Sequence, residues 1–178
     1  MKKIFLAAIF SALCVFAYAA PVPKGYGGVT LGMGLDEAKK ALLDNGEFGY
    51  NGDADVSLLP GDDRILIETD ASAYGSAAFL SQCWFQFYEE KLYTITINFN
   101  PARLDHYSIY SSLCKKYGEP AEFSPERSVW YGDGISMSLE RPLSIKYIDT
   151  KTAEKLQQKS LVEKTASEKT RDMFLEGL

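Results

Sequence analysis

The sequence predicts an α+β protein, in which an antiparallel sheet is built from two modules of one helix and three strands, followed by a C-terminal helix. Segments with alternating apolar and polar residues follow one another through tight turns, and such short connections join antiparallel strands. Each run of strands comes after a stretch with helical periodicity. Helices and hairpins in this order are typical of the α+β class, with helices covering part of a sheet.

The first helix is predicted over residues 35–44. Its apolar residues recur at helical spacing, at Leu35, Ala38, Ala41 and Leu42. Gly34 stands at the N-cap, acidic residues fill the first turn, and Gly46 follows the last turn.

The glycines before this helix resemble a dinucleotide-binding fingerprint, because Gly32 and Gly34 are followed by Glu37 in the pattern G-x-G-x-x-E. The third glycine is missing. Asp36 and Glu37 also place negative charge where a pyrophosphate would need free helix amides. No nucleotide is therefore expected at this site.

The strands of the first module are expected at 64–69 and on both sides of residues 89–91, after a loop over 47–63. A three-residue turn at 89–91 pairs Phe85 with Ile95 and Cys83 with Ile97, with Tyr93 on the same apolar face. A shift of one residue would mix the two faces of the sheet, so we expect this register.

The second module is expected to contain a helix over 102–117 and strands over 128–131, 135–139 and 143–148. The inner stripe of its helix is predicted to be Tyr107, Tyr110, Leu113, Cys114 and Tyr117. The two modules form a single domain over 35–149, with possible repeats at 29–99 and 102–149. A surface helix is expected over 150–178, where apolar residues are sparse.

The first nineteen residues predict a cleaved signal peptide. Lys2 and Lys3 precede an apolar run, and small residues at positions 17 and 19 favour cleavage after Ala19. The shortness of the apolar run disfavours an uncleaved anchor, and Leu13 before Cys14 disfavours a lipoprotein. We expect a periplasmic or secreted protein without stable membrane insertion, in which residues 20–34 connect the leader to the domain.

Charge and cysteine content narrow the expected partners. The net charge of −5 becomes more negative once the two leader lysines are removed, which disfavours nucleic acid and anionic membrane surfaces. Cys83 and Cys114 are both expected to face the core, so an oxidising compartment makes them a candidate disulfide. The alternative is two separate buried thiols.

Residues suited to catalysis are few. His106 is the only histidine, and no Gly-x-Ser-x-Gly elbow accompanies it. Asp53 and Asp55 begin like a calcium loop, but Leu58 occupies the position that requires glycine. We therefore expect no catalytic residue, no metal ligand and no cofactor. A small ligand or cation held by the Asp53–Asp63 loop or a cleft is the alternative function.

The outward face of the hairpin is the predicted binding surface, consisting of Trp84, Gln86, Tyr88, Thr94 and Thr96. Aromatic residues among short polar ones are typical of protein-recognition surfaces. The alternative is that the C-terminal helix covers this face.

Three segments carry a family resemblance. The start of the first helix matches at Val29, Leu31, Gly32, Met33, Glu37 and Leu42, and residues 84–99 and 113–120 match an aromatic strand pair and a helix end. In these features the chain resembles the small exported SmpA/OmlA-like and β-lactamase-inhibitor-protein-like domains, although Gly34 replaces their usual Ser or Thr cap. The resemblance implies helix-plus-sheet modules that bind another envelope or secreted protein, and it brings no catalytic residue.

Overall fold

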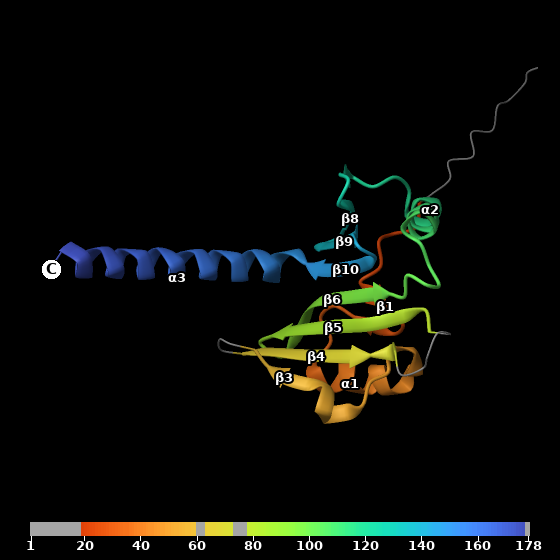
Figure 1. Ribbon diagram of the computed structural model, residues 1–178, viewed down its shortest axis with the longest axis horizontal. Coiled ribbons are helices and arrows are strands. Elements are labelled where there is room, and N and C mark those ends of the chain that lie inside the picture. Colours follow the sequence, from red (N-terminus) through yellow and green to blue (C-terminus); the bar gives the residue numbers. More distant parts are fainter. Residues whose placement is uncertain (1–18, 60–62, 73–77, 177–178) are drawn as a thin grey trace, which may run out of the picture.

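A computed structural model describes residues 19–59, 63–72 and 78–176. It has an α+β fold, as predicted, with the order of elements shown in Figure 1. The helices are α1 (Leu35–Asp44), α2 (His106–Tyr117) and α3 (Thr150–Glu176), with short 3-10 helices η1 (Gly46–Phe48) and η2 (Gly52–Asp55). The strands are β1 (Gly25–Tyr26), β2 (Val29–Thr30), β3 (Val56–Leu58), β4 (Arg64–Asp70), β5 (Leu80–Tyr88), β6 (Lys91–Phe99), β7 (Glu122–Phe123), β8 (Arg127–Gly132), β9 (Ile135–Glu140) and β10 (Ser144–Asp149). All of the predicted leader except Ala19 lies outside the described residues.

The main sheet is antiparallel, with strand order β3-β4-β5-β6-β10-β9-β8-β7. The first module comprises α1 and β4–β6, and the second comprises α2 and β8–β10. The third strand of each module, β6 or β10, lies beside the other at the centre of the sheet. The two modules therefore meet along one pair of strands.

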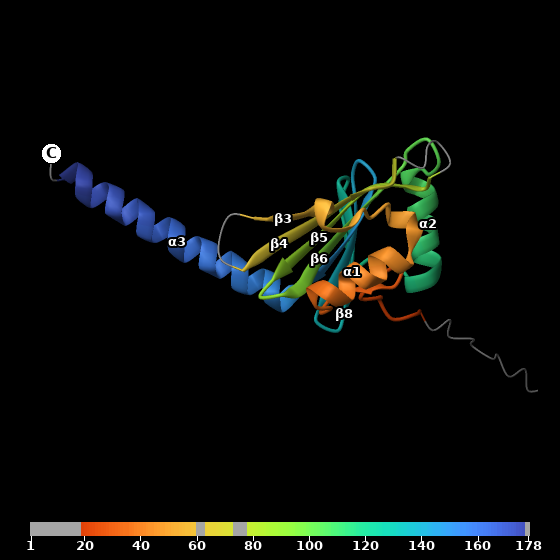
Figure 2. The same ribbon diagram turned by 90° about the horizontal axis from the view of Figure 1, so that it is seen from below.

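Both module helices lie on the same side of the sheet (Figure 2). Ala38 and Leu42 of α1 are buried, as are Ile109 and Leu113 of α2. The sheet supplies most of the core beneath them, from Ile67, Phe85, Phe87, Ile95, Ile97, Met137, Leu139, Ile145 and Tyr147. We call this side of the sheet the covered face.

The β5–β6 hairpin differs from the predicted one at its turn. Glu89 and Glu90 form a two-residue turn with φ of 49° and 60°, which places Phe87 opposite Leu92. One extra residue in β6, Tyr93, then restores the predicted pairs Phe85–Ile95 and Cys83–Ile97. The three-residue turn was wrong, because a bulge inside the strand changes the register just as an added turn residue would.

Helix α2 begins four residues later than predicted. Asp105 is its N-cap, and the Asp105 carboxylate accepts a hydrogen bond from the Ser108 amide at 2.9 Å. Residues 101–103 form a turn instead. The predicted inner stripe was wrong in part, since Tyr107 is exposed while Ile109 and Leu113 carry the packing.

Short elements fill the segments expected to be irregular. Strands β1 and β2 form a small hairpin within residues 20–34, and β3 forms one edge of the main sheet within 47–63. Two or three residues are too few to show a period in the sequence, so these strands gave no signal.

Helix α3 follows β10 directly and extends away from the sheet (Figure 1). Leu156 is buried, whereas the residues described after it are exposed. Lys155 joins the base of α3 to the β5–β6 turn through an ion pair with Glu89 at 2.7 Å. Among the described helices, none combines the length and apolar character needed to cross a bilayer.

Candidate functional site

The sheet has a second face, opposite α1 and α2, which we call the open face. Strand alternation and the hydrogen bonds described below bring together side chains from four strands there. They are Leu66 and Glu68 of β4, Trp84, Gln86 and Tyr88 of β5, Tyr93, Thr94 and Thr96 of β6, and Lys146 and Ile148 of β10. All five residues predicted for the binding surface lie on this face.

Hydrogen bonds between neighbouring strands hold the long polar side chains of the open face. The Trp84 indole Nε1 donates to Glu68 Oε1 at 2.9 Å, and the Tyr93 hydroxyl donates to Gln86 Oε1 at 2.9 Å. Because these partners restrict the rotamers, less conformational entropy would be lost when another molecule binds.

Burial separates the five predicted residues into two groups. Thr94 and Thr96 are only 7% and 5% exposed, so they form the floor between longer side chains. Tyr88 is also buried, and the Lys155 ammonium of α3 lies 5.0 Å from the centre of its ring. Trp84 and Gln86 remain half-buried and provide accessible surface.

Sequence reasoning missed part of this surface. Tyr93 was expected on the covered face, but the bulge turns it to the open face, where it contacts Gln86. Leu66 lies opposite Gln86, and Ile148 lies opposite Thr94. The alternation of residues 64–69 could have identified Leu66 as part of the surface. Ile148 could be placed there only once β10 was known to pair with β6, which was not predicted.

An ion pair crosses the open face beside these residues. The Lys146 ammonium donates to Glu140 Oε2 at 2.9 Å, and the Ser138 hydroxyl donates to Glu140 Oε1 at 2.8 Å. Burial raises the pKa of the Glu140 carboxyl, but these two hydrogen bonds and the Lys146 charge outweigh it, so the pKa lies below its usual value. Glu140 is therefore ionised at neutral pH, which leaves this part of the face charged but locally compensated.

The predicted disulfide is absent, because Cys83 and Cys114 are both free thiols. Cys83 lies in the core opposite Ile97, and burial raises its pKa to about 12. Cys114 lies instead toward the end of α2, where its thiol is 3.8 Å from a Glu119 carboxylate oxygen. The two residues belong to different modules, and their helix and strand do not bring the thiols together.

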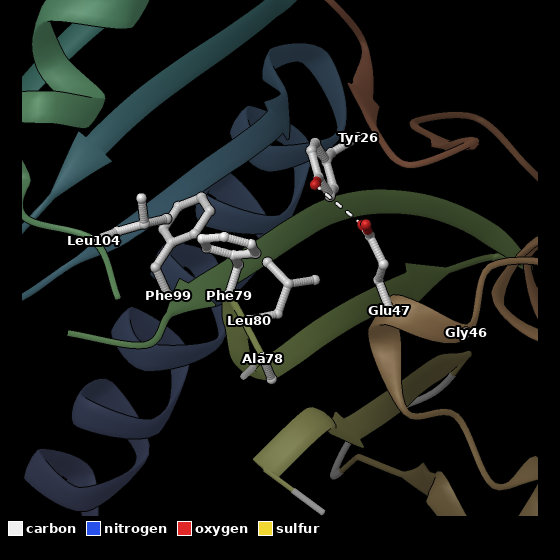
Figure 3. Close-up of a pocket in the computed structure, with 8 residues that line it drawn as sticks. All are labelled: Tyr26, Gly46, Glu47, Ala78, Phe79, Leu80, Phe99 and Leu104. Carbon is white, nitrogen blue, oxygen red and sulfur yellow. Dashed lines mark hydrogen bonds between the residues drawn. The ribbon is translucent and has the colours of Figure 1, made fainter. Parts of the chain in front are cut away.

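A cleft lies on the covered side, and Figure 3 shows its walls. Its volume is about 530 Å³, and Phe79, Leu80, Phe99 and Leu104 provide an apolar lining. On the opposite wall the Tyr26 hydroxyl donates to Glu47 Oε2 at 3.3 Å. Burial and the Glu47 charge raise the pKa of Tyr26, which therefore stays protonated and able to donate. This size and lining are typical of sites for small molecules.

Two carboxylates of the acidic loop considered for cations are hydrogen-bonded within the protein. The Asp53 carboxylate accepts a hydrogen bond from the Lys39 ammonium at 2.8 Å, and the Asp55 carboxylate accepts one from the Asn51 amide at 2.7 Å. Asp62 lies outside the described residues. Within the described ranges no group of three His, Cys, Asp or Glu side chains is arranged to hold a metal ion.

Comparison with models of protein families gives a match. The family model described as the TP0088 domain matches residues 24–159, which include both modules and the base of α3. Comparisons with curated proteins and with solved structures returned no match. The matched region ends three residues after Leu156, the last buried residue described in α3. Because the match covers most of the sequence, the chain belongs to the TP0088 domain family.

Proposed function

We propose that this protein is an exported, non-enzymatic domain that binds another envelope or secreted protein through the open face of its sheet. The observation that supports this most strongly is the one-sided cover of the sheet. Both module helices pack on the covered face, while Trp84, Leu66 and Ile148 remain half-buried on the other. Export rests on the leader predicted from residues 1–19.

The composition of the open face supports a protein partner. Interface centres are enriched in aromatic residues, and tryptophan is frequent among the residues that dominate binding energy. Trp84 lies opposite Glu68, to which its indole donates, and diagonally across from Leu66, which pairs with Gln86 of the same strand as Trp84. The compensated pair Lys146–Glu140 lies farther across the sheet and suits a polar rim.

A paired substitution tests this proposal. Leu66→Ala with Trp84→Ala should weaken capture of the partner from an envelope extract at least about tenfold, because the pair removes the apolar centre of the surface. Leu43→Ala on α1 is the matched control, since Leu43 is 64% exposed on the other side of the molecule. Equal capture by the double variant and the wild type, with both folded by circular dichroism, would rule out the open face.

The cleft in Figure 3 favours a second candidate function, the binding of a small apolar ligand. A ligand that binds only the folded state raises the midpoint of thermal unfolding. A short-chain alkyl alcohol should therefore raise this midpoint in the wild type. It should not do so after Leu104→Arg, which would place a charge at the cleft wall. An equal rise in both proteins would exclude the cleft as the binding site.

A further inference from the structure

A separate pocket of about 500 Å³ lies at the beginning of α2. It is lined by His106, Tyr107 and Tyr110 of α2, by Phe123 and Ser124, and by Arg141 after β9. It shares no lining residue with the cleft of Figure 3. Neither the protein-binding proposal nor the cleft makes use of these residues.

The first notable feature of the pocket is the way Arg141 is held. Its Nε donates to the Pro125 carbonyl at 2.8 Å, and its backbone amide donates to the Glu126 carbonyl at 3.0 Å. In the described part of the chain no carboxylate pairs with Arg141, and its two terminal guanidinium nitrogens have no hydrogen-bond partner. The guanidinium is thus fixed at one nitrogen and available at the others. That arrangement suits a carboxylate, which can accept from a guanidinium fork.

The second feature is a buried imidazole nitrogen. Nε2 of His106 is shielded from solvent and has no hydrogen-bond partner among the described residues. Buried polar atoms are nearly always hydrogen-bonded, so an unpaired one points to a missing partner. Burial lowers the pKa of His106 and the Arg141 charge lowers it further, while the Asp105 carboxylate offsets part of this shift. An anion bound beside Arg141 would raise the pKa of His106.

Aromatic rings supply the walls of the pocket. Tyr107 and Phe123 are 75% and 72% exposed, which is high for large apolar side chains. Phe123 packs edge-on against Tyr110, with ring centres 6.1 Å apart. Exposed rings around a concave site can take up a flat apolar group by stacking or edge contacts.

We propose that this pocket binds a small aromatic carboxylate, with its carboxylate on the Arg141 guanidinium beside His106 and its ring against Tyr107 and Phe123. Asp105 also lies at the pocket, but its carboxylate accepts from the Ser108 amide at 2.9 Å and from the Ser108 hydroxyl at 2.6 Å. These bonds hold the Asp105 carboxylate in the helix cap and lower its pKa, so it stays ionised there. The remaining titratable groups lining the pocket are the Tyr107 and Tyr110 hydroxyls.

The single histidine of the chain makes a direct experiment possible, because the Cε1 proton of its imidazole gives one assignable NMR signal. Titration of the purified protein with 3-phenylpropionate should shift this signal to saturation and raise the pKa of His106. The alcohol 3-phenylpropan-1-ol, which lacks the charge, should bind at least about tenfold more weakly. A tripeptide ending in phenylalanine tests whether a peptide C-terminus is the source of the same chemistry.

Two variants complete the test. Arg141→Gln should weaken binding at least about tenfold, because it removes the charge that faces the carboxylate. Arg127→Gln is the control, since Arg127 is exposed, pairs with Glu122 and lies outside the pocket lining. If Arg141→Gln does not fold, Phe123→Ser tests the aromatic wall in its place and should also weaken binding. A signal that does not saturate, equal affinity for acid and alcohol, or unchanged binding by these pocket variants would overturn the proposal.

Discussion

The two faces of the sheet are built from different kinds of residues, although both come from the same strands. On the covered face large apolar side chains such as Phe85 and Ile95 are fully buried beneath α1 and α2. On the open face small polar side chains form the floor, as at Thr94 and Thr96, and longer residues are hydrogen-bonded above them. Stability is thus concentrated on one face, which leaves the other free to carry a binding surface.

The largest effect is expected at Phe85, which is fully buried and packs edge-on against Phe48 with ring centres 5.5 Å apart. Phe85→Ala should lower the free energy of unfolding by about 3–5 kcal/mol, because it leaves a cavity in the core. Urea unfolding followed by circular dichroism measures this change. A loss below about 1 kcal/mol would mean that the covered face does not carry the stability.

Trp84 is the matched position, since it precedes Phe85 on the same strand and faces the other way. Trp84→Ala should lower the free energy of unfolding by about 1 kcal/mol, because the variant loses the hydrogen bond to Glu68 and the partly buried apolar surface of the indole. The same unfolding experiment applies. A cost equal to that of Phe85→Ala would show that Trp84 is a core residue rather than part of a surface.

The β5–β6 turn offers a smaller, stabilising change. Glu90 has φ of 60°, a conformation in which side chains other than glycine are strained. Glu90→Gly should raise the free energy of unfolding by about 0.5 kcal/mol and strengthen the register that assigns residues to the two faces. Destabilisation, measured by thermal unfolding, would argue against the two-residue turn.

An effect as small as that of the turn is expected from the Glu140–Lys146 pair. The Glu140 pKa is lowered in the folded protein, so the ionised carboxylate stabilises the fold above its unfolded-state pKa of 4.5. This contribution is lost as the pH falls through the lower, folded value. Glu140→Gln should lower the free energy of unfolding by only about 0.5 kcal/mol at pH 7, because solvent screens the ion pair. The difference between the variant and the wild type should vanish in acid. An undiminished difference at pH 3 would contradict the electrostatic origin.

Local patterns in the sequence were enough to predict the fold class, the first helix at 35–44 and the opposite directions of Trp84 and Phe85. These features depend on period and capping within a few residues. The bulge at Tyr93 was not predictable, because a bulge and a longer turn shift the register alike. Helix α2 starts late because Asp105, rather than an earlier residue, serves as its N-cap.

The sites were harder to predict than the fold. The two threonines of the predicted surface proved to be its floor, while Leu66 and Ile148 join it through strand pairings distant in sequence. The pocket beside His106 needs Arg141, which is brought there by the hairpins of the second module. No short motif in the sequence indicates that Arg141 and His106 come together in the fold.

Photo-crosslinking in the native cell tests the central claim most directly. A benzophenone amino acid replaces Trp84 on the open face or, in a separate variant, Leu43 on α1. We predict a discrete protein adduct from position 84 and none from position 43, with the adduct lost after Leu66→Ala. No adduct from position 84, or the same adduct from both positions, would contradict a protein-binding role for the open face.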